Sequence, residues 1–483
     1  MKKAWTDLTA PAKSRAAKQS RLRGSPEFQS RTKRRIFMKR AVPSSLPRPF
    51  FGREERWCAA GDSLTIGGYY HQFVYLYYAT RFPENRLDVV NCGISGNKVS
   101  HLLQRLDDDI LVHKPTVVSI LLGMNDVGQT FPAEASDDFV TYERDQAVEV
   151  FREGMHEFLT RLKKARVRAI LMTPGLYDAT LVHPEAPPIN RGLKRALVKC
   201  GAVVRKLAGE FGATLVDWHQ PLANWNLKFQ KGDPVATLIG LDRVHAGEIG
   251  NFVMAFEFLK ALGAPREVAR LSLDASTGRP LDLAGASITN VARGARSVAF
   301  KFTEKSLPFP VPEGCRSMLN LIPFVERLNC ETLQVKNLPR DTYQLRIDGV
   351  GIRSFSAAQL HKGVNLALET ATPQYRQAVA VSELVARRAY IDRSHLRCIA
   401  ENEWSFLREF KLDEMSRVEI KKVLDQKIEA AKGQPWYDYC KQQAARYIES
   451  KPHEGAYRAE VAVLLEQINR LNKPWPHYLE ISR

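Results

Sequence analysis

The chain has 483 residues, of which 44% are hydrophobic and 26% are charged. This length exceeds the roughly 250–300 residues at which a single hydrophobic core stops growing, so we expect at least two domains. The composition is that of a globular protein, which excludes wholesale disorder and collagen-like repeats. No apolar run approaches the roughly 18 residues that would predict a membrane-spanning helix.

Most of the net charge of +18 lies at the start of the chain. Residues 1–50 hold 14 Lys or Arg and only two acids, Asp7 and Glu27, so they carry +12 and leave +6 for the rest. Because this segment also has few large apolar residues, we predict a disordered basic tail. Such a tail is either a solvated extension, which we favour, or a segment attracted to polyanions.

Residues 34–39, with the sequence RRIFMK, resemble the twin-arginine export motif. An export signal also needs an apolar segment after that motif, whereas residues 40–51 contain three prolines and two arginines, Arg40 and Arg48. The seven cysteines include no CxxC pair and predict neither a disulfide framework nor a zinc site. We therefore expect a cytoplasmic protein by default.

From residue 53 to 263, short apolar runs alternate with longer amphipathic stretches, as in βα units that build a parallel sheet. The predicted strands are Arg56–Ala60, Leu87–Asn91, Thr116–Leu122, Val167–Met172 and Thr214–Asp217. The predicted helices are Tyr69–Arg81, Val99–Val112, Glu143–Ala165, Ile189–Phe211 and Gly247–Leu262. The pattern predicts a three-layer α/β/α domain over residues 51–265, with a five-stranded parallel sheet.

After Pro265 the apolar period changes to two, as in Val298, Phe300 and Phe302. Asp348-Gly349 follows a similar run and predicts a hairpin turn. We expect a small antiparallel β domain over residues 266–375. Residues 376–483 return to a helical period, and we expect these helices to pack back on the body of the protein.

Small, hydroxyl or amide residues follow three successive predicted strands. Ser63 follows the first, Gly96 the second and Asn125 the third. The carboxyl ends of parallel strands meet at one sheet edge, where such sheets bind ligands, so we expect these residues to lie close together. A lone serine at a strand-to-helix turn is usually only a helix N-cap. Asp242 and His245, which precede the last predicted helix, make a chemical role more plausible.

The segments GDSLT (61–65), GISGN (93–97), GMND (123–126) and DRVH (242–245) resemble the blocks of the SGNH hydrolases, also called the GDSL family of esterases and lipases. The resemblance covers about residues 53–263, with the blocks in the family's order. It implies a flavodoxin-like SGNH-type fold, the catalytic triad Ser63, Asp242 and His245, and no metal or cofactor. It also implies an oxyanion hole made by Ser63, Gly96 and Asn125.

The chemistry agrees with this assignment. A serine hydroxyl is a weak nucleophile until an imidazole takes its proton, and a carboxylate can orient that imidazole. The DxxH pattern alone is weak, because Asp392 and His395 repeat it in a helical region. We favour Asp242 and His245, which follow the last strand of the predicted sheet.

The resemblance implies a serine esterase that hydrolyses short-chain or acetyl O-acyl esters through an acyl-enzyme. Its partner would be a small-molecule or carbohydrate ester, as in a carbohydrate O-deacetylase, and no specific nucleic acid is expected. Two alternatives stay open: a lysophospholipase or thioesterase-type acyl hydrolase, and a noncatalytic protein that binds glycan or polyanion. The aromatic-rich helix at Tyr69–Arg81 could line an acyl or sugar site, although packing on the sheet is the favoured interpretation.

Overall fold

The computed structural model describes residues 49–67, 69–128, 138–434 and 436–483, which belong to one compact unit. Almost all of the predicted basic tail over residues 1–50 therefore lies outside the described residues. Within the described ranges, no helix combines the length and apolar character needed to cross a bilayer.

Five parallel strands form the first sheet, in the order β2-β1-β3-β4-β5. Their bounds are β1 Arg56–Gly61, β2 Asp88–Gly93, β3 Val117–Leu121, β4 Arg168–Met172 and β5 Thr214–Val216. All five predicted strands are confirmed to within two residues. Alternate side chains of β1 face opposite layers, with Trp57 in one buried apolar cluster and Cys58 in the other.

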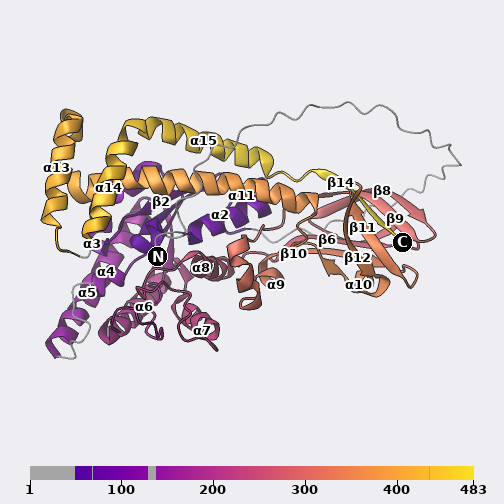
Figure 1. Ribbon diagram of the computed structural model, residues 1–483, viewed down its shortest axis with the longest axis horizontal. Helices are drawn as coiled ribbons and strands as arrows, with labels where there is room; N and C mark the ends of the chain where they lie inside the picture. The colour runs from indigo at the N-terminus through magenta and orange to yellow at the C-terminus, as the bar shows by residue number, and fades with distance from the viewer. Residues whose placement is uncertain (1–48, 68, 129–137, 435) are drawn as a thin grey trace. The chain divides into compact units, whose positions relative to one another are not determined.

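Helices cover both faces of this sheet, which confirms the predicted three-layer fold (Figure 1). One face is covered by α2 (Tyr70–Arg81) and α8 (Glu248–Ala261). The other is covered by α3 (Val99–Gln104), α5 (Asp138–Lys164) and α6 (Arg191–Phe211). Two short helices follow strands: α1 (Ser63–Ile66) follows β1, and α4 (Met124–Val127) follows β3. A further helix, α7 (His219–Phe229), was not predicted from the sequence.

The aromatic side chains of α2 belong to the core. The buried ones are Tyr70, Phe73, Tyr75, Tyr77 and Tyr78. Their rings pack within the same apolar cluster as α8 and the sheet. This placement favours the packing interpretation of the aromatic-rich helix over a role in lining a substrate site.

The helix predicted at Val99–Val112 is not a continuous α-helix. After α3 the chain widens into a π-helical turn, η1 (Leu106–Ile110), and then tightens into a 3-10 turn, η2 (Leu111–His113). In η1 the Asp109 carboxylate meets two buried arginines, Arg105 and Arg397. Such wider turns occur mostly as single turns within α-helices.

Two sheets make up the β region, in the orders β13-β10-β6-β7 and β12-β11-β14-β9-β8. The bounds are β6 Glu267–Asp274, β7 Arg279–Ala284, β8 Ala286–Gly294, β9 Ser297–Glu304, β10 Cys330–Lys336, β11 Thr342–Ile347, β12 Val350–Ser356, β13 Val364–Asn365 and β14 Pro476–Ser482. The predicted hairpin turn is confirmed, with positive φ at both Asp348 and Gly349. One pair departs from the predicted antiparallel pattern, because β6 and β10 are parallel. The chain between β6 and β10 contains three strands and the helical segments η3 (Glu313–Asn320) and α9 (Phe324–Leu328). This segment is long enough for the crossover connection that a parallel pair requires.

The chain beyond residue 356 is mostly helical. Its helical elements are α10 Ala357–Lys362, α11 Pro373–Ile391, η4 Asp392–Leu396, α12 Arg397–Asn402, η5 Glu403–Leu407, η6 Leu412–Glu414, α13 Arg417–Ala430, α14 Tyr437–Ser450, η7 Lys451–His453 and α15 Glu454–Leu471. α11 contacts both α2 and α15 (Figure 1). Val381 and Val385 of α11 lie in the same buried cluster as α2, so these helices share the core of the α/β layers.

The last residues depart from the helical prediction for 376–483. Pro476–Ser482 forms strand β14, which pairs with β9 and β11 in the middle of the second sheet of the β region. Its side chains alternate, with His477, Leu479 and Ile481 buried. The tertiary pairing overrides the helical pattern of the preceding residues.

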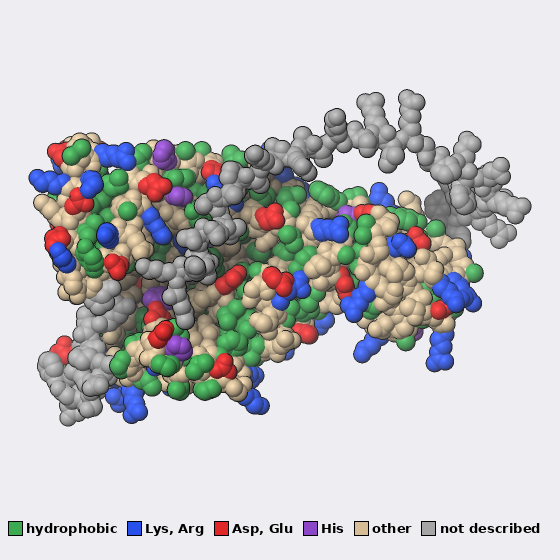
Figure 2. Space-filling model, in the orientation of Figure 1, with side chains coloured by type: hydrophobic (Ala, Val, Ile, Leu, Met, Phe, Trp, Pro, Cys, Tyr) green, Lys and Arg blue, Asp and Glu red, His purple; other side chains and the backbone are tan. Residues whose placement is uncertain are grey.

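Charges of both signs are spread over the surface. On the face drawn in Figure 2, Lys and Arg side chains are interspersed with Asp and Glu. This agrees with the small net charge expected for the chain after residue 50.

Candidate active site

Ser63 lies where β1 ends and α1 begins. The Asp62 carboxylate caps this short helix by accepting a hydrogen bond from the Leu64 amide at 2.9 Å. Position 61 requires glycine, because neighbouring atoms leave no room for a side chain. A Cβ there would lie 2.3 Å from Thr65 Oγ1 and 2.6 Å from Leu121 O. The turn therefore holds Ser63 at the carboxyl edge of the sheet, with its side chain half-buried.

His245 and Asp242 lie in the loop before α8 and reach Ser63. His245 Nε2 lies 2.7 Å from Ser63 Oγ, and His245 Nδ1 lies 2.6 Å from Asp242 Oδ2. The other carboxylate oxygen, Asp242 Oδ1, accepts from the amides of Val244 and His245 at 3.0 and 2.9 Å. The three predicted side chains thus form one continuous hydrogen-bonded chain.

Arg243, between these two residues, fixes the loop. It has a φ of 68° and is buried. Its guanidinium donates to the carbonyls of Asp178, Leu181 and Pro187 at 2.7–3.0 Å. The segment Leu176–Pro188 therefore supports the loop that carries His245.

Hydrogen bonding within this chain shifts the pKa of both titrating groups. The hydrogen bond that His245 donates to Asp242 raises the pKa of His245 above its usual range, against the opposing effect of burial. Burial alone would raise the pKa of Asp242, but hydrogen bonds from the His245 side chain and two backbone amides hold it below its ordinary value. The arrangement favours an ionised Asp242 beside an imidazole of increased basicity.

Gly96 and Asn125 lie at the ends of the neighbouring strands. The Asn97 amide donates to Ile94 O at 3.2 Å, and Gly96 has a φ of 74°, which is the geometry of a type II turn with glycine at its third position. Asn125 is buried, and its Nδ2 donates to Asp62 Oδ2 at 3.1 Å and to Asn97 O at 3.2 Å. An oxyanion bound by Asn125 would therefore share the hydrogens of this side-chain amide with Asp62 Oδ2 and Asn97 O.

Asp62 links the first and third strand ends. Its Oδ1 caps α1 and its Oδ2 accepts from Asn125. Burial raises the pKa of Asp62 to about 7, although the Leu64 amide opposes this shift. Through these contacts Asp62 braces the turn that carries Ser63.

A buried cluster of Arg105, Asp109 and Arg397 joins the strand ends to one another. Arg105 donates to the carbonyls of Gly61 and Cys92 at 3.2 and 2.8 Å, and it pairs with Asp109. Arg397 pairs with Asp109 through two hydrogen bonds of 2.7 and 2.9 Å and donates to Gly93 O. Sequence reasoning missed this cluster, because the only local signal is the four-residue spacing of Arg105 and Asp109.

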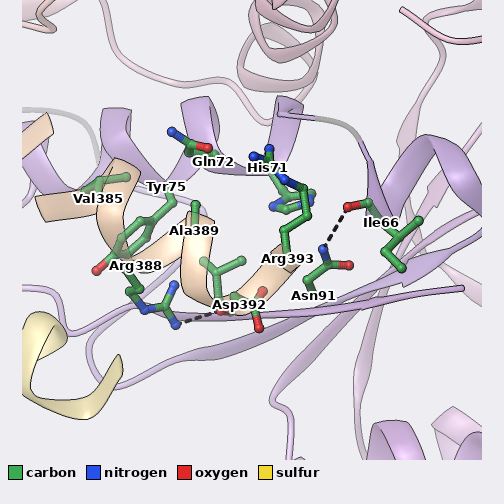
Figure 3. Close-up of a pocket in the computed structure, with 11 residues that line it drawn as sticks. Ile66, His71, Gln72, Tyr75, Asn91, Val385, Arg388, Ala389, Asp392 and Arg393 are labelled. Carbon is green, nitrogen blue, oxygen red and sulfur yellow. Dashed lines mark hydrogen bonds between the residues drawn. The ribbon is translucent and has the colours of Figure 1, made fainter. Parts of the chain in front are cut away.

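The second DxxH segment has different partners. His395 Nδ1 lies 2.9 Å from Ser450 Oγ, and its ring stacks on Tyr457 at a centroid distance of 4.1 Å. Asp392 lines the pocket between α2 and α11 shown in Figure 3, where Arg388 and Arg393 also lie. The structure thus places Asp392 and His395 apart from the hydrogen-bonded chain that contains Ser63.

All seven cysteines are buried and unpaired in the structure. Among the described residues, no cluster of three or more His, Cys, Asp or Glu side chains is arranged to hold a metal ion.

Comparison with known proteins shows that the α/β layers are similar to acyl hydrolases. Residues 59–251 match the model of the GDSL-like lipase/acylhydrolase family. An acetylxylan esterase from Geobacillus stearothermophilus is 29% identical over 227 residues, which cover 44% of this chain and 95% of that protein. The solved structure of a gut microbial diltiazem-metabolizing enzyme is 28% identical and covers 91% of this chain and 99% of its own, with a TM-score of 0.80. The last match extends well beyond the α/β layers.

Proposed function

Because residues 59–251 form a domain of the GDSL-like lipase/acylhydrolase family, we propose that the protein is a serine esterase that cleaves short-chain or acetyl O-acyl esters. The observation that carries this proposal is the continuous chain from Ser63 Oγ through His245 to Asp242, with bonds of 2.7 and 2.6 Å. Such a chain gives a serine hydroxyl the adjacent base that it needs to attack a carbonyl.

In the proposed reaction, Ser63 Oγ attacks the ester carbonyl while His245 Nε2 takes the hydroxyl proton. Asp242 holds the imidazole and stabilises the imidazolium. The carbonyl oxygen becomes an oxyanion, which accepts hydrogen bonds from the amides of Ser63 and Gly96 and from the Asn125 side chain. The intermediate collapses, the alcohol leaves with the proton from His245, and water then hydrolyses the acyl-enzyme by the same steps.

The substrate we propose is a short acyl ester of a bulky alcohol, such as a carbohydrate. Two observations support it: the acetylxylan esterase relative aligns over the α/β layers, and the site is open to solvent. The side chains of His245 and Asp242 are 44% and 53% exposed, so a large alcohol group has room beside Ser63.

A series of p-nitrophenyl esters tests the acyl preference. We expect kcat/KM to be highest for the acetyl ester and to fall for butyryl, octanoyl and palmitoyl esters. Acetylated xylo-oligosaccharide, assayed by acetate release, tests the alcohol in parallel. Fastest hydrolysis of the octanoyl or palmitoyl ester would instead favour a lysophospholipase or thioesterase-type acyl hydrolase.

The pH dependence of kcat/KM tests the role of His245. Only the imidazole with a free Nε2 can take the serine proton, so activity is expected to fall as the pH drops through the pKa of His245. Because the hydrogen bond to Asp242 raises this pKa, the midpoint should lie above the ordinary histidine value of about 6.5. The initial rates are corrected with a Ser63→Ala blank at each pH. A midpoint below the ordinary value would contradict this role.

A further inference from the structure

The turn that carries Gly96 is anchored by a part of the chain outside residues 59–251. The Ser95 amide donates to Glu401 Oε1 of α12 at 2.9 Å. Tyr439 of α14 donates its hydroxyl hydrogen to the same carboxylate at 2.8 Å, and its oxygen lies 2.8 Å from Ser95 Oγ. Since Tyr439 has one hydroxyl hydrogen, Ser95 must donate to Tyr439. Glu401 and Tyr439 therefore hold the backbone amide and the hydroxyl of Ser95.

Glu401 is an unusual acid, because it is only 4% exposed. Both of its carboxylate oxygens accept hydrogen bonds. Hydrogen bonds to a carboxylate are about twice as strong as those between neutral groups. Burial of an acid also costs free energy unless such bonds satisfy it. The hydrogen bond from the Ser95 amide thus offsets part of the free-energy cost of burying Glu401. The same bond fixes the position of the Ser95 amide.

This anchor matters because the other hydrogen bonds of the turn hold its two ends, Ile94 and Asn97, rather than Gly96 itself. Gly96 is exposed, and a Cβ added there would meet no atom within 4 Å. Glycine also adopts positive and negative φ with similar ease. The Gly96 N–H belongs to the Ser95–Gly96 peptide, one end of which is the Cα of Ser95, so the bonds made by the Ser95 amide and hydroxyl fix the end of the turn from which this N–H is presented.

We propose that Glu401 and Tyr439 are positioning residues that hold the Gly96 amide in the direction needed to bind the oxyanion. This inference rests on the proposed function. It makes α12 and α14 part of the active-site architecture, although they lie far along the chain from the family's own domain. The similarity to the diltiazem-metabolizing enzyme also extends over most of the chain.

The experiment compares Glu401→Ala, Glu401→Gln and Glu403→Ala in the full chain, with p-nitrophenyl acetate as substrate. Glu403 is the matched control, because it is a nearby half-buried acid whose carboxylate meets Tyr447 and Lys451 instead of the turn. We expect Glu401→Ala to lower kcat about 10- to 100-fold with KM nearly unchanged, below the 10²- to 10³-fold loss for deleting an oxyanion donor. Glu401→Gln should recover kcat to within about threefold of the parent, because its amide oxygen still accepts from Ser95.

Inhibition by phenylboronic acid, which forms a tetrahedral adduct with an active serine, separates positioning from general loss of structure. Its inhibition constant should rise in Glu401→Ala by the same factor by which kcat/KM falls. In Glu403→Ala it should stay at the parent value. If Glu401→Ala does not fold, Tyr439→Phe replaces it, since that ring is 40% exposed and only the hydroxyl is lost. We expect a loss of about threefold or more in kcat from that variant, as one of the two anchors remains.

Parental kcat in both Glu401→Ala and Tyr439→Phe would overturn the positioning role, provided that Ser63→Ala has lost turnover. Parental turnover in Ser63→Ala would overturn the proposed function itself. The two failures are therefore distinguishable in one set of assays.

Discussion

Ser63→Ala is expected to lower kcat for p-nitrophenyl acetate by at least about 10⁴-fold, because removal of the nucleophile leaves only the oxyanion donors and substrate binding. The fold should be unaffected. Ser63 is half-buried, and its partner His245 is partly exposed, so water can replace the lost hydrogen bond. Initial rates and circular dichroism spectra of the parent and the variant, recorded side by side, measure both expectations.

Ser100→Ala is the matched control, since Ser100 is an exposed serine in α3. It should keep the parental rate. A fluorophosphonate probe should add to the parent and to Ser100→Ala at Ser63, as mapped by peptide mass, and should leave Ser63→Ala unmodified. Turnover in Ser63→Ala comparable to that of the parent would rule out the serine mechanism.

Asp109→Ala is expected to lower the free energy of unfolding by about 3–5 kcal/mol, the usual cost of removing one partner from a buried ion pair. Asp109 pairs with both Arg105 and Arg397, whose side chains are 0% and 4% exposed. Without the carboxylate, two guanidinium groups stay buried with no counter-charge from this position. Equilibrium urea unfolding, followed by circular dichroism, measures the change.

Asp108→Ala provides the comparison, because Asp108 is the exposed neighbour of Asp109 in the same π-helical turn. Its effect should stay within about 0.5 kcal/mol. The arginines hold the pKa of Asp109 below its usual range, although burial opposes them. The stability contributed by Asp109 should therefore be present above the ordinary aspartate pKa and disappear as the pH falls through its lowered value. Equal urea midpoints for the two variants at neutral pH would contradict a stabilising cluster.

The α/β layers could be predicted because their signals are local. Each strand of the sheet is a short apolar run, and residues such as Gly61 stand where the backbone leaves no room for a side chain. The resemblance of four short segments then identified Ser63, Asp242 and His245, which the structure brings within hydrogen-bonding distance. Their catalytic roles remain predictions until the variants are assayed.

The contacts that support the site could not be predicted, because they join distant parts of the chain. Arg397 lies 288 residues from Asp109, and Glu401 lies 306 residues from Ser95. Neither segment carries a pattern that names its partner. Strand β14 was missed for a related reason: Leu479 and Ile481 alternate with polar residues, but the run is short and follows a long helical pattern.

The position of β14 in the sheet also means that the sheet cannot be completed until the end of the chain has been synthesised. Phe300 of β9 pairs with Leu479 of β14, and β14 separates β9 from β11. Both neighbours are synthesised well before it, and each keeps an unpaired edge until β14 emerges. At about 5–20 residues per second, a ribosome needs on the order of 10–30 s to travel from β9 to β14. During that interval the nascent protein presents open strand edges, which are templates for aggregation, so chaperone occupancy on the ribosome should be longest over this region.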